Sequence, residues 1–149
     1  MRATLRAVAA CCLLAAAPAT ADTLKLDVNG VERSARVYPG KRADREPSPL
    51  VLVFHGLGDN ERNFANIVDF HRDWREATVV YPAGRERADR DGMPGWHGFR
   101  DNDANDDLAF VDRLLETLAA RYQVDPAQVF VTGFSNGGHM TFNLLLDRP

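Results

Sequence analysis

The pentapeptide 133–137 (GFSNG) constrains this chain more than any other feature of its sequence. It follows an apolar run of strand length, 128–132, and precedes a segment whose apolar spacing is typical of a helix. A chain that reverses sharply from strand to helix strains the central residue, Ser135, and side chains two positions before and after it would collide. Glycine at both positions therefore predicts a tight turn that raises the Ser135 hydroxyl above the edge of a sheet.

This placement indicates nucleophilic chemistry. The backbone amide of Asn136, at the start of the helix, would point to where negative charge forms on a substrate oxygen. A second loop, 55–58 (HGLG), directly follows an apolar strand that should lie beside the strand leading to Ser135. Its glycines permit close approach, so Leu57 is the candidate for a second amide donor. We interpret His55 as structural, and a glycine-rich turn with an idle serine is the alternative interpretation of the pentapeptide.

The apolar pattern predicts one hairpin and then alternating strands and helices. The hairpin joins 23–28 to 31–38 through the Asn29-Gly30 turn. Residues 83–105 form a long loop of the kind that often carries function. The other predicted elements are strand 50–54, helix 60–70, strand 77–81, a helix capped by Asp106 or Asp107 that ends near 121–122, strand 128–132 and helix 137–146. This order calls for an α/β fold with a mostly parallel sheet and helices on both faces.

The first 21 residues are predicted to be a secretory signal peptide. They combine two arginines, an apolar run too short to span a membrane, and the small-residue motif Ala19-Thr20-Ala21. We therefore expect a secreted protein, extracellular or periplasmic, with residues 22–149 as its folded domain and no stable membrane insertion after cleavage. Both cysteines, Cys11 and Cys12, lie in the signal, so the mature chain would hold no disulfide.

Charge and composition exclude several classes of function. The net charge is -3, from 18 basic and 21 acidic residues, whereas a nucleic-acid binder would be expected to carry a basic surplus. His71 and His97 have no spacing to other histidines that would suit metal ligands. We therefore expect no nucleic-acid partner, no metal and no cofactor.

The chain resembles the secreted α/β-hydrolase esterases of the polyhydroxybutyrate depolymerase, feruloyl esterase and acetyl xylan esterase group. The matching stretches are LVLVFHGLGDN (50–60), VVYPAG (79–84), GWHGF (95–99) and the run 106–142 that contains the pentapeptide. The resemblance implies Ser135 as nucleophile, backbone oxyanion donors at Leu57 and Asn136, and a loop 83–105 that flanks the substrate cleft. The residues expected at the cleft are His55, Gly56 and Trp96. Trp96 would stack on a sugar or aromatic ring, or would alternatively pack in the core.

The order of the catalytic residues departs from the family pattern. An α/β-hydrolase triad runs Ser, then Asp or Glu, then His, and the one histidine after Ser135 is His139, a single helical turn away. We therefore expect the acid and the base beyond Pro149, and we interpret 22–149 as an incomplete α/β-hydrolase domain whose C-terminal strands are missing. Strand 128–132 would then be an exposed apolar edge, and residues 22–149 alone would be poorly soluble and inactive.

The leading hypothesis is a serine carboxylic-ester hydrolase that acts through an acyl-enzyme. Its substrates would be feruloyl or acetyl esters of polysaccharides, or polyhydroxyalkanoate-type polyesters. The alternatives are a peptidase or thioesterase on the same scaffold, a non-catalytic carbohydrate-binding protein that keeps the fold, and a degraded reading frame whose product never folds.

Overall fold

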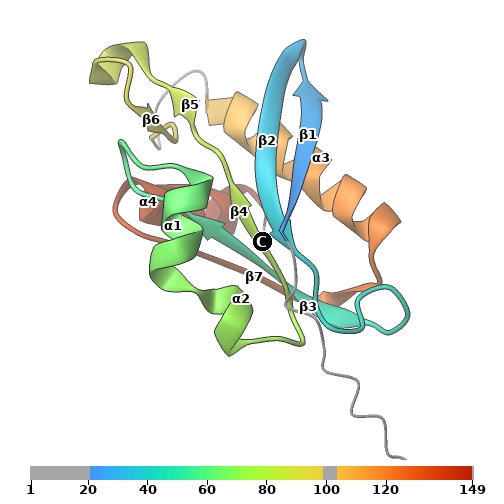
Figure 1. Ribbon diagram of the computed structural model, residues 1–149. Coiled ribbons are helices and arrows are strands. Elements are labelled where there is room, and N and C mark those ends of the chain that lie inside the picture. Colours follow the sequence, from blue (N-terminus) through green and yellow to red (C-terminus); the bar gives the residue numbers. More distant parts are fainter. Residues whose placement is uncertain (1–20, 99–103, 149) are drawn as a thin grey trace, which may run out of the picture.

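The computed structural model describes residues 21–98 and 104–148 and shows a sheet with helices on both sides (Figure 1). Five strands form the main sheet in the order β1-β2-β4-β3-β7. They are β1 (Asp22–Val28), β2 (Val31–Tyr38), β3 (Ser48–Phe54), β4 (Thr78–Pro82) and β7 (Val124–Gly133). The helices are α1 (Glu61–Val68), α2 (Phe70–Asp73), α3 (Ala104–Arg121) and α4 (Asn136–Asp147), and a small hairpin pairs β5 (Arg85–Glu86) with β6 (Pro94–Gly95).

The strand pairing confirms the parallel central strands that the sequence predicts after the hairpin. β3 pairs in parallel with β4 on one side and with β7 on the other, whereas β1–β2 and β2–β4 are antiparallel. The hairpin turn is made by Asn29 and Gly30, with φ values of 54° and 80°. Positive φ at both turn residues matches the right-handed twist of the strands that the turn connects.

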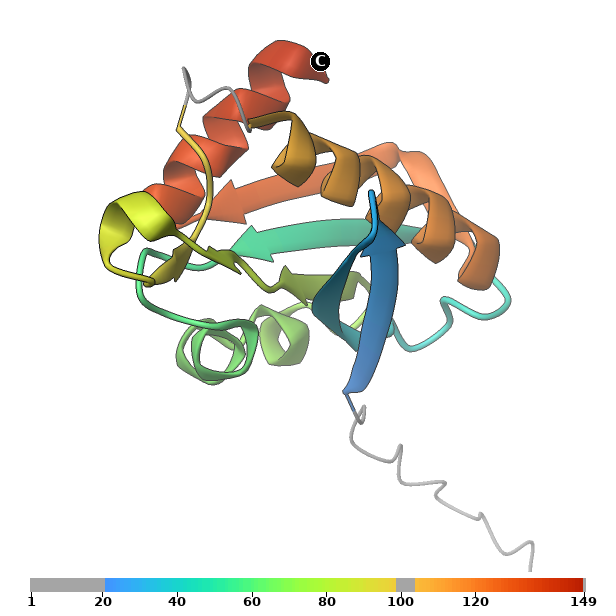
Figure 2. The same cartoon turned by 90° about the horizontal axis from the view of Figure 1, so that it is seen from above.

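Two apolar cores lie on opposite faces of the sheet. α3 and α4 cover one face, and α1 and α2 cover the other (Figure 2). The first core joins α3 and α4 to β3 through Leu114, Met140 and Leu52, and the second joins α1 to β3 and β4 through Phe64 and Val53. β3 contributes to both cores because its successive side chains point to opposite faces, which explains its unbroken apolar run.

Several predicted boundaries are wrong. Helix α3 begins at Ala104, so Asp106 and Asp107 lie in its first turn and do not cap it. The predicted loop 83–105 contains the β5–β6 hairpin and a short 3-10 helix, Ala88–Arg90. β7 starts at Val124 instead of 128, and its register against β3 shifts between Val124 and Val129. The predicted signal peptide falls almost entirely on residues 1–20, outside the described residues.

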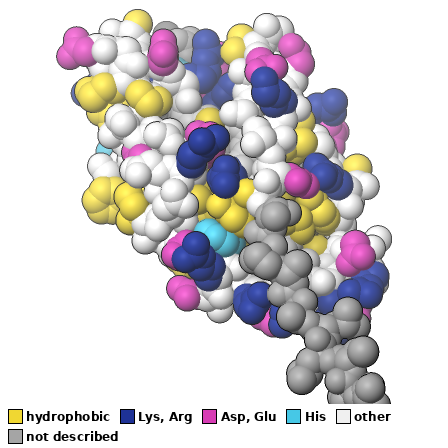
Figure 3. All heavy atoms as spheres, in the orientation of Figure 1, with side chains coloured by type: hydrophobic (Ala, Val, Ile, Leu, Met, Phe, Trp, Pro, Cys, Tyr) yellow, Lys and Arg dark blue, Asp and Glu magenta, His cyan; other side chains and the backbone are white. Residues whose placement is uncertain are grey.

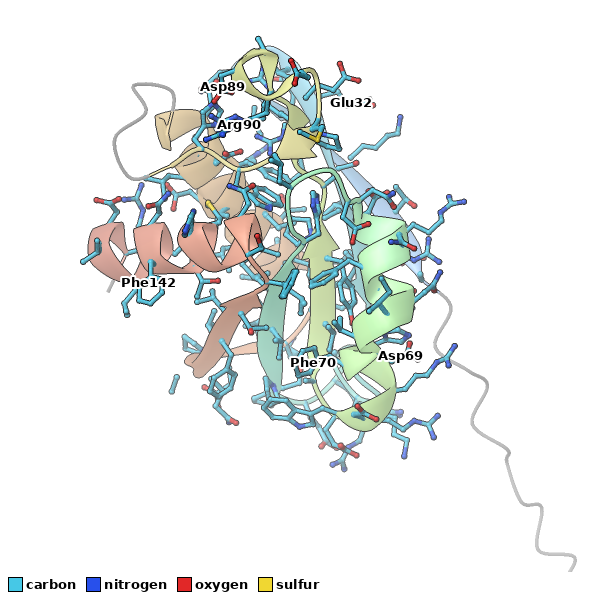
Figure 4. All side chains as sticks on the ribbon, turned by 90° about the vertical axis from the view of Figure 1, so that its left-hand side faces the viewer. Glu32, Asp69, Phe70, Asp89, Arg90 and Phe142 are labelled. Carbon is cyan, nitrogen blue, oxygen red and sulfur yellow. The ribbon has the colours of Figure 1, made fainter. Side chains whose placement is uncertain are left out.

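Strand β7 lies at one edge of the sheet, as the sequence predicts. Its Val129 and Phe130 side chains are 39% and 44% exposed. The adjacent helix α4 also exposes apolar side chains, and Phe142 projects from its outer side (Figure 4). Within the described residues, no helix has the length and apolar character that a membrane crossing requires.

Candidate active site

The turn between β7 and α4 holds Ser135 as its glycine neighbours predict. Ser135 has φ 52° and ψ −116°, a region that costs strain for any residue with a side chain. A Cβ on Gly133 would collide with the Gly137 carbonyl oxygen, and a Cβ on Gly137 would collide with the Phe54 carbonyl oxygen. Both flanking positions therefore require glycine, and the predicted strained turn is confirmed.

The Ser135 side chain is open to a substrate. The residue is exposed, and its hydroxyl makes no capping hydrogen bond to the described part of α4. It stands at the N-terminal end of this helix, where unpaired amides and the helix dipole favour negative charge. A substrate oxygen that becomes an oxyanion would be stabilised at this end of the helix.

The loop 55–58 meets the serine turn because β3 and β7 are parallel neighbours whose carboxyl ends lie side by side. The Phe134 amide donates to the Phe54 carbonyl at 3.1 Å, which carries the sheet pairing into the turn. A Cβ on Gly56 would lie 3.3 Å from Phe134 Cδ1 and 3.6 Å from the Cβ of Ser135. The predicted proximity of the two loops is confirmed, and the donor roles of the Leu57 and Asn136 amides stay predictions.

His55 is a buried structural residue. Its ring Nε2 accepts from the Gly84 amide at 2.9 Å, and Nδ1 lies 2.8 Å from the Gly56 carbonyl oxygen, to which it donates. Burial lowers the pKa of the imidazole, which favours the neutral tautomer that these two bonds require. The structural interpretation of His55 is therefore confirmed. His55 and Gly56 are both buried beside the serine turn, and their place at a substrate cleft stays a prediction.

Trp96 is fully buried, which contradicts its placement in the substrate cleft. The indole packs edge-on against Phe54 with ring centroids 5.1 Å apart, and its Nε1 donates to the His55 carbonyl at 2.9 Å. The packing alternative is therefore the right one. A large ring with one polar atom suits an interior site where that atom finds a partner.

A buried network of charged side chains joins β2, α3 and His97, the residue after Trp96. Asp107 accepts from Arg33 Nη2 at 2.9 Å, and its other oxygen accepts from the His97 amide at 2.9 Å and lies 2.8 Å from His97 Nδ1. Burial alone would raise the pKa of the Asp107 carboxyl, but the His97 hydrogen bond and the Arg33 charge outweigh it and hold that pKa below its usual range. The network anchors His97 to the protein interior.

Sequence reasoning missed this network, although a signal for it was present. Arg33 shares its face of β2 with Ala35 and Val37, which are each 1% exposed. An arginine in such a row is buried, and a buried arginine requires a carboxylate partner. The structure shows that this partner is Asp107, in the first turn of α3.

The rings of three of the four histidines contact groups other than Ser135. His55 is held by two backbone groups, and His97 is held by Asp107. The ring of His71 stacks on Tyr38 with centroids 3.6 Å apart, and its Nδ1 lies 3.2 Å from the Tyr81 hydroxyl. The fourth, His139, is fixed by its position on α4, where its amide donates to the Ser135 carbonyl at 3.2 Å.

The charges on the described surface do not form a basic stripe on the face shown in Figure 3, where acidic and basic side chains are interspersed. The tip of the β5–β6 hairpin shows the same mixing, since Asp89 accepts from Arg87 and pairs with Arg90 (Figure 4). Among residues 21–98 and 104–148, no cluster of three or more histidine, cysteine or acidic side chains could hold a metal ion.

Relatives of this chain include a feruloyl esterase and an acetylxylan esterase. Feruloyl esterase D of Neurospora crassa is 27% identical over 140 residues, which cover 85% of this chain and 44% of that protein. A bifunctional acetylxylan esterase/xylanase of Neocallimastix patriciarum is 28% identical over 78% of this chain and 16% of its own length. The chain spans less than half the length of the curated relatives it matches.

A solved structure supports the fold independently. The S-formylglutathione hydrolase of Agrobacterium tumefaciens superposes with a TM-score of 0.68 at 18% identity, over 87% of this chain and 53% of that one. At such low identity the likeness shows a shared α/β-hydrolase fold. Residues 41–149 match the family described as Phospholipase/Carboxylesterase. This match covers more than half of the chain and includes both the 55–58 loop and the serine turn, so the protein belongs to the phospholipase/carboxylesterase family of α/β-hydrolases.

Proposed function

We propose that this chain is the nucleophile-bearing part of a secreted serine carboxylic-ester hydrolase. One observation carries the proposal: an exposed serine is held at positive φ between two glycines that tolerate no side chain, at the N-terminal end of a helix. Strain of about 1–3 kcal/mol persists in a fold when the surrounding structure enforces it, and such strain clusters at functional sites. A turn that needs this conformation ordinarily places glycine there, so a serine at this position points to a use for its hydroxyl.

The proposed reaction runs through an acyl-enzyme. The Oγ of Ser135 attacks the ester carbonyl carbon while its proton passes to a base, and the oxyanion is stabilised by the amides of Leu57 and Asn136. The bond to the leaving alcohol oxygen then breaks as that oxygen takes the proton. Water attacks the acyl-enzyme, releases the carboxylic acid and returns the proton to Ser135.

The base is proposed to lie beyond Pro149, together with its carboxylate partner. Three observations support this: the imidazoles of His55, His71 and His97 are each engaged by other groups, the triad order requires the histidine after the serine, and the relatives are longer than this chain. Removal of a triad member leaves about 10³–10⁴-fold catalysis over water, so residues 22–149 alone would be nearly inactive.

The proposed substrates are feruloyl or acetyl esters attached to polysaccharides. The names of the relatives in Neurospora and Neocallimastix support this class. Polyhydroxyalkanoate esters are the second ester class that the sequence resemblance suggests. Export of the protein would bring it to either polymer, and the predicted signal peptide supports export.

The test compares the protein isolated from its host, at the length the host produces, with its Ser135→Ala variant. We expect hydrolysis of methyl ferulate or 4-nitrophenyl acetate, lost by at least about 10³-fold in the variant, and covalent labelling of Ser135 by a fluorophosphonate. The control is Asn143→Ala, which changes a buried residue of the same helix; the folded variant should retain activity. Equal activity in wild type and Ser135→Ala would overturn the proposal, and preference for a thioester or a peptide would move the reaction to that class. Retained carbohydrate binding without hydrolysis would indicate a binding protein.

A further inference from the structure

A short segment, 94–96, lies between the two loops that carry the proposed oxyanion donors. On one side, the Gly58 amide donates to the Pro94 carbonyl at 2.8 Å. On the other side, the Trp96 amide donates to Asn136 Oδ1 at 2.7 Å, and Asn136 Nδ2 donates to the Trp96 carbonyl at 2.9 Å. The segment therefore connects the 55–58 loop to the residue that follows Ser135.

The segment fits this gap without spare room. A Cβ on Gly95 would lie 2.7 Å from Asn136 Oδ1 and 2.8 Å from Leu57 Cδ1, so both loops contact the Gly95 backbone. From a third direction, a Cβ on Gly84 would lie 2.8 Å from the Gly95 carbonyl oxygen. A side chain at position 95 would therefore displace the Asn136 amide and the end of the Leu57 side chain.

The chemistry of the Asn136 side chain suits this connection. A primary amide carries both an acceptor and a donor, so it can pair with the N–H and the C=O of one residue as a neighbouring strand would. The Trp96 carbonyl also accepts from Arg87 Nη1 at 2.6 Å, and the Trp96 indole donates to the His55 carbonyl. Trp96 is therefore held at three points, and the Asn136 side chain is attached to a fixed anchor.

We propose that the side chain of Asn136 is a positioning residue that sets the distance between the two oxyanion donors. The Asn136 side chain bonds to Trp96 and so fixes the Asn136 backbone amide relative to the 94–96 segment. The same segment bonds to Gly58 and so fixes the adjacent Leu57 amide. The inference rests on the proposed esterase function and adds a role for the side chain to the role of the backbone. Loss of one oxyanion donor costs about 10²–10³-fold in kcat, and a displacement of about 1 Å can cost about 10²-fold.

The kinetic test uses Asn136→Ala in the protein at the length its host produces, with 4-nitrophenyl acetate as substrate. The expected result is a kcat lower by about 10–100-fold with a KM within about threefold of wild type, because the donors act on the transition state more than on the bound ester. A KM rise at unchanged kcat would overturn the proposal and make the side chain a substrate contact. Unchanged kcat and KM would overturn it as well.

Two further variants isolate the connection. Asn143→Ala is the matched control, because Asn143 is a buried asparagine of α4 that donates to the His97 carbonyl at 3.1 Å, one residue after the segment. Its kcat should stay within about threefold of wild type. Gly95→Ala pushes the segment away from both loops and should lower kcat as Asn136→Ala does, with a double variant no worse than the more impaired single one.

An amide measurement separates this proposal from the esterase proposal. In ¹⁵N-labelled protein, Asn136→Ala should shift the amide resonances of Leu57 and Gly58, which lie across the segment, and Asn143→Ala should leave both in place. If the wild type hydrolyses no ester while these shifts occur, the function fails and the positioning stands. Should Asn136→Ala not fold, hydrogen exchange in the wild type decides: the Gly58 and Trp96 amides should be protected to the same degree, and fast exchange at either would overturn the connection.

Discussion

Two neighbouring regions of this protein are built in opposite ways. The first is the serine corner, made by the ends of β3 and β7 with the 55–58 loop and the 94–96 segment, where polar backbone groups are paired and glycines fill the close contacts. The second is the outer flank of β7 and α4, where apolar side chains are exposed. Its members are Phe130, Phe142, Leu145 and Leu146, with exposed fractions of 44%, 58%, 61% and 67%.

The difference teaches where the stability of this chain resides. At the serine corner the polar groups of neighbouring segments form hydrogen bonds with one another. Removal of one side chain there leaves a buried group without its hydrogen-bond partner. At the outer flank the side chains contribute little to folding, because they remain in water. We therefore expect substitutions at buried positions to lower the free energy of unfolding much more than substitutions at exposed positions of the same helix.

The largest effect is expected from Asp107→Ala. The change leaves Arg33 buried without its carboxylate and removes both contacts to His97, so the free energy of unfolding should fall by about 3–5 kcal/mol in urea denaturation. Asp112→Ala is the control, because Asp112 lies on the same helix and pairs with Arg148 at an exposed site. Its cost should be about 0.2–1 kcal/mol. Equal costs for the two variants would refute the buried network.

A smaller contrast is expected between two adjacent leucines of α4. Leu144 is 4% exposed in the core between α4 and the sheet, whereas Leu145 is 61% exposed on the outer flank. Leu144→Ala should lower the free energy of unfolding by about 2–5 kcal/mol, and Leu145→Ala should change it by less than about 0.5 kcal/mol. Thermal and urea unfolding of the pair measure this. A large cost at Leu145 would show that the outer flank is covered in the native protein.

The smallest effect is expected from mild acid. Burial lowers the pKa of His55 and of His71, so both rings favour the neutral form in the folded protein. Their contribution to stability is present above the ordinary histidine pKa near 6.5 and is lost as the pH falls below it toward the folded values. Stability should therefore decrease between pH 7 and pH 5, and the ring protons of His55 should titrate below pH 6.5 in NMR spectra. Rising stability over this range would contradict the burial of neutral rings.

Much of the fold could be predicted because the pattern of apolar residues is local. The hairpin around Asn29 and Gly30, the buried run of β3 and the order of strands and helices all follow from periodicity and turn chemistry. Boundaries were less predictable. Asp107 has the chemistry of a helix cap, but its carboxylate instead meets Arg33 and His97, and α3 begins earlier. The buried row around Arg33 indicates that this arginine needs a carboxylate, but only the tertiary fold selects one 74 positions away.

The site, like the fold, has features that the sequence predicts and features that only the tertiary structure decides. The sequence by itself determined that Ser135 would lie on a strained turn, because no side chain fits at Gly133 or Gly137 and that collision involves only near neighbours in the chain and the adjacent strand. It also predicted that the 55–58 loop would reach this turn. Only the tertiary structure decided that Trp96 packs in the core and that the Asn136 side chain forms hydrogen bonds with the Trp96 backbone. Those outcomes depend on which distant segment fills the space beside the turn, and packing of the whole domain sets that choice.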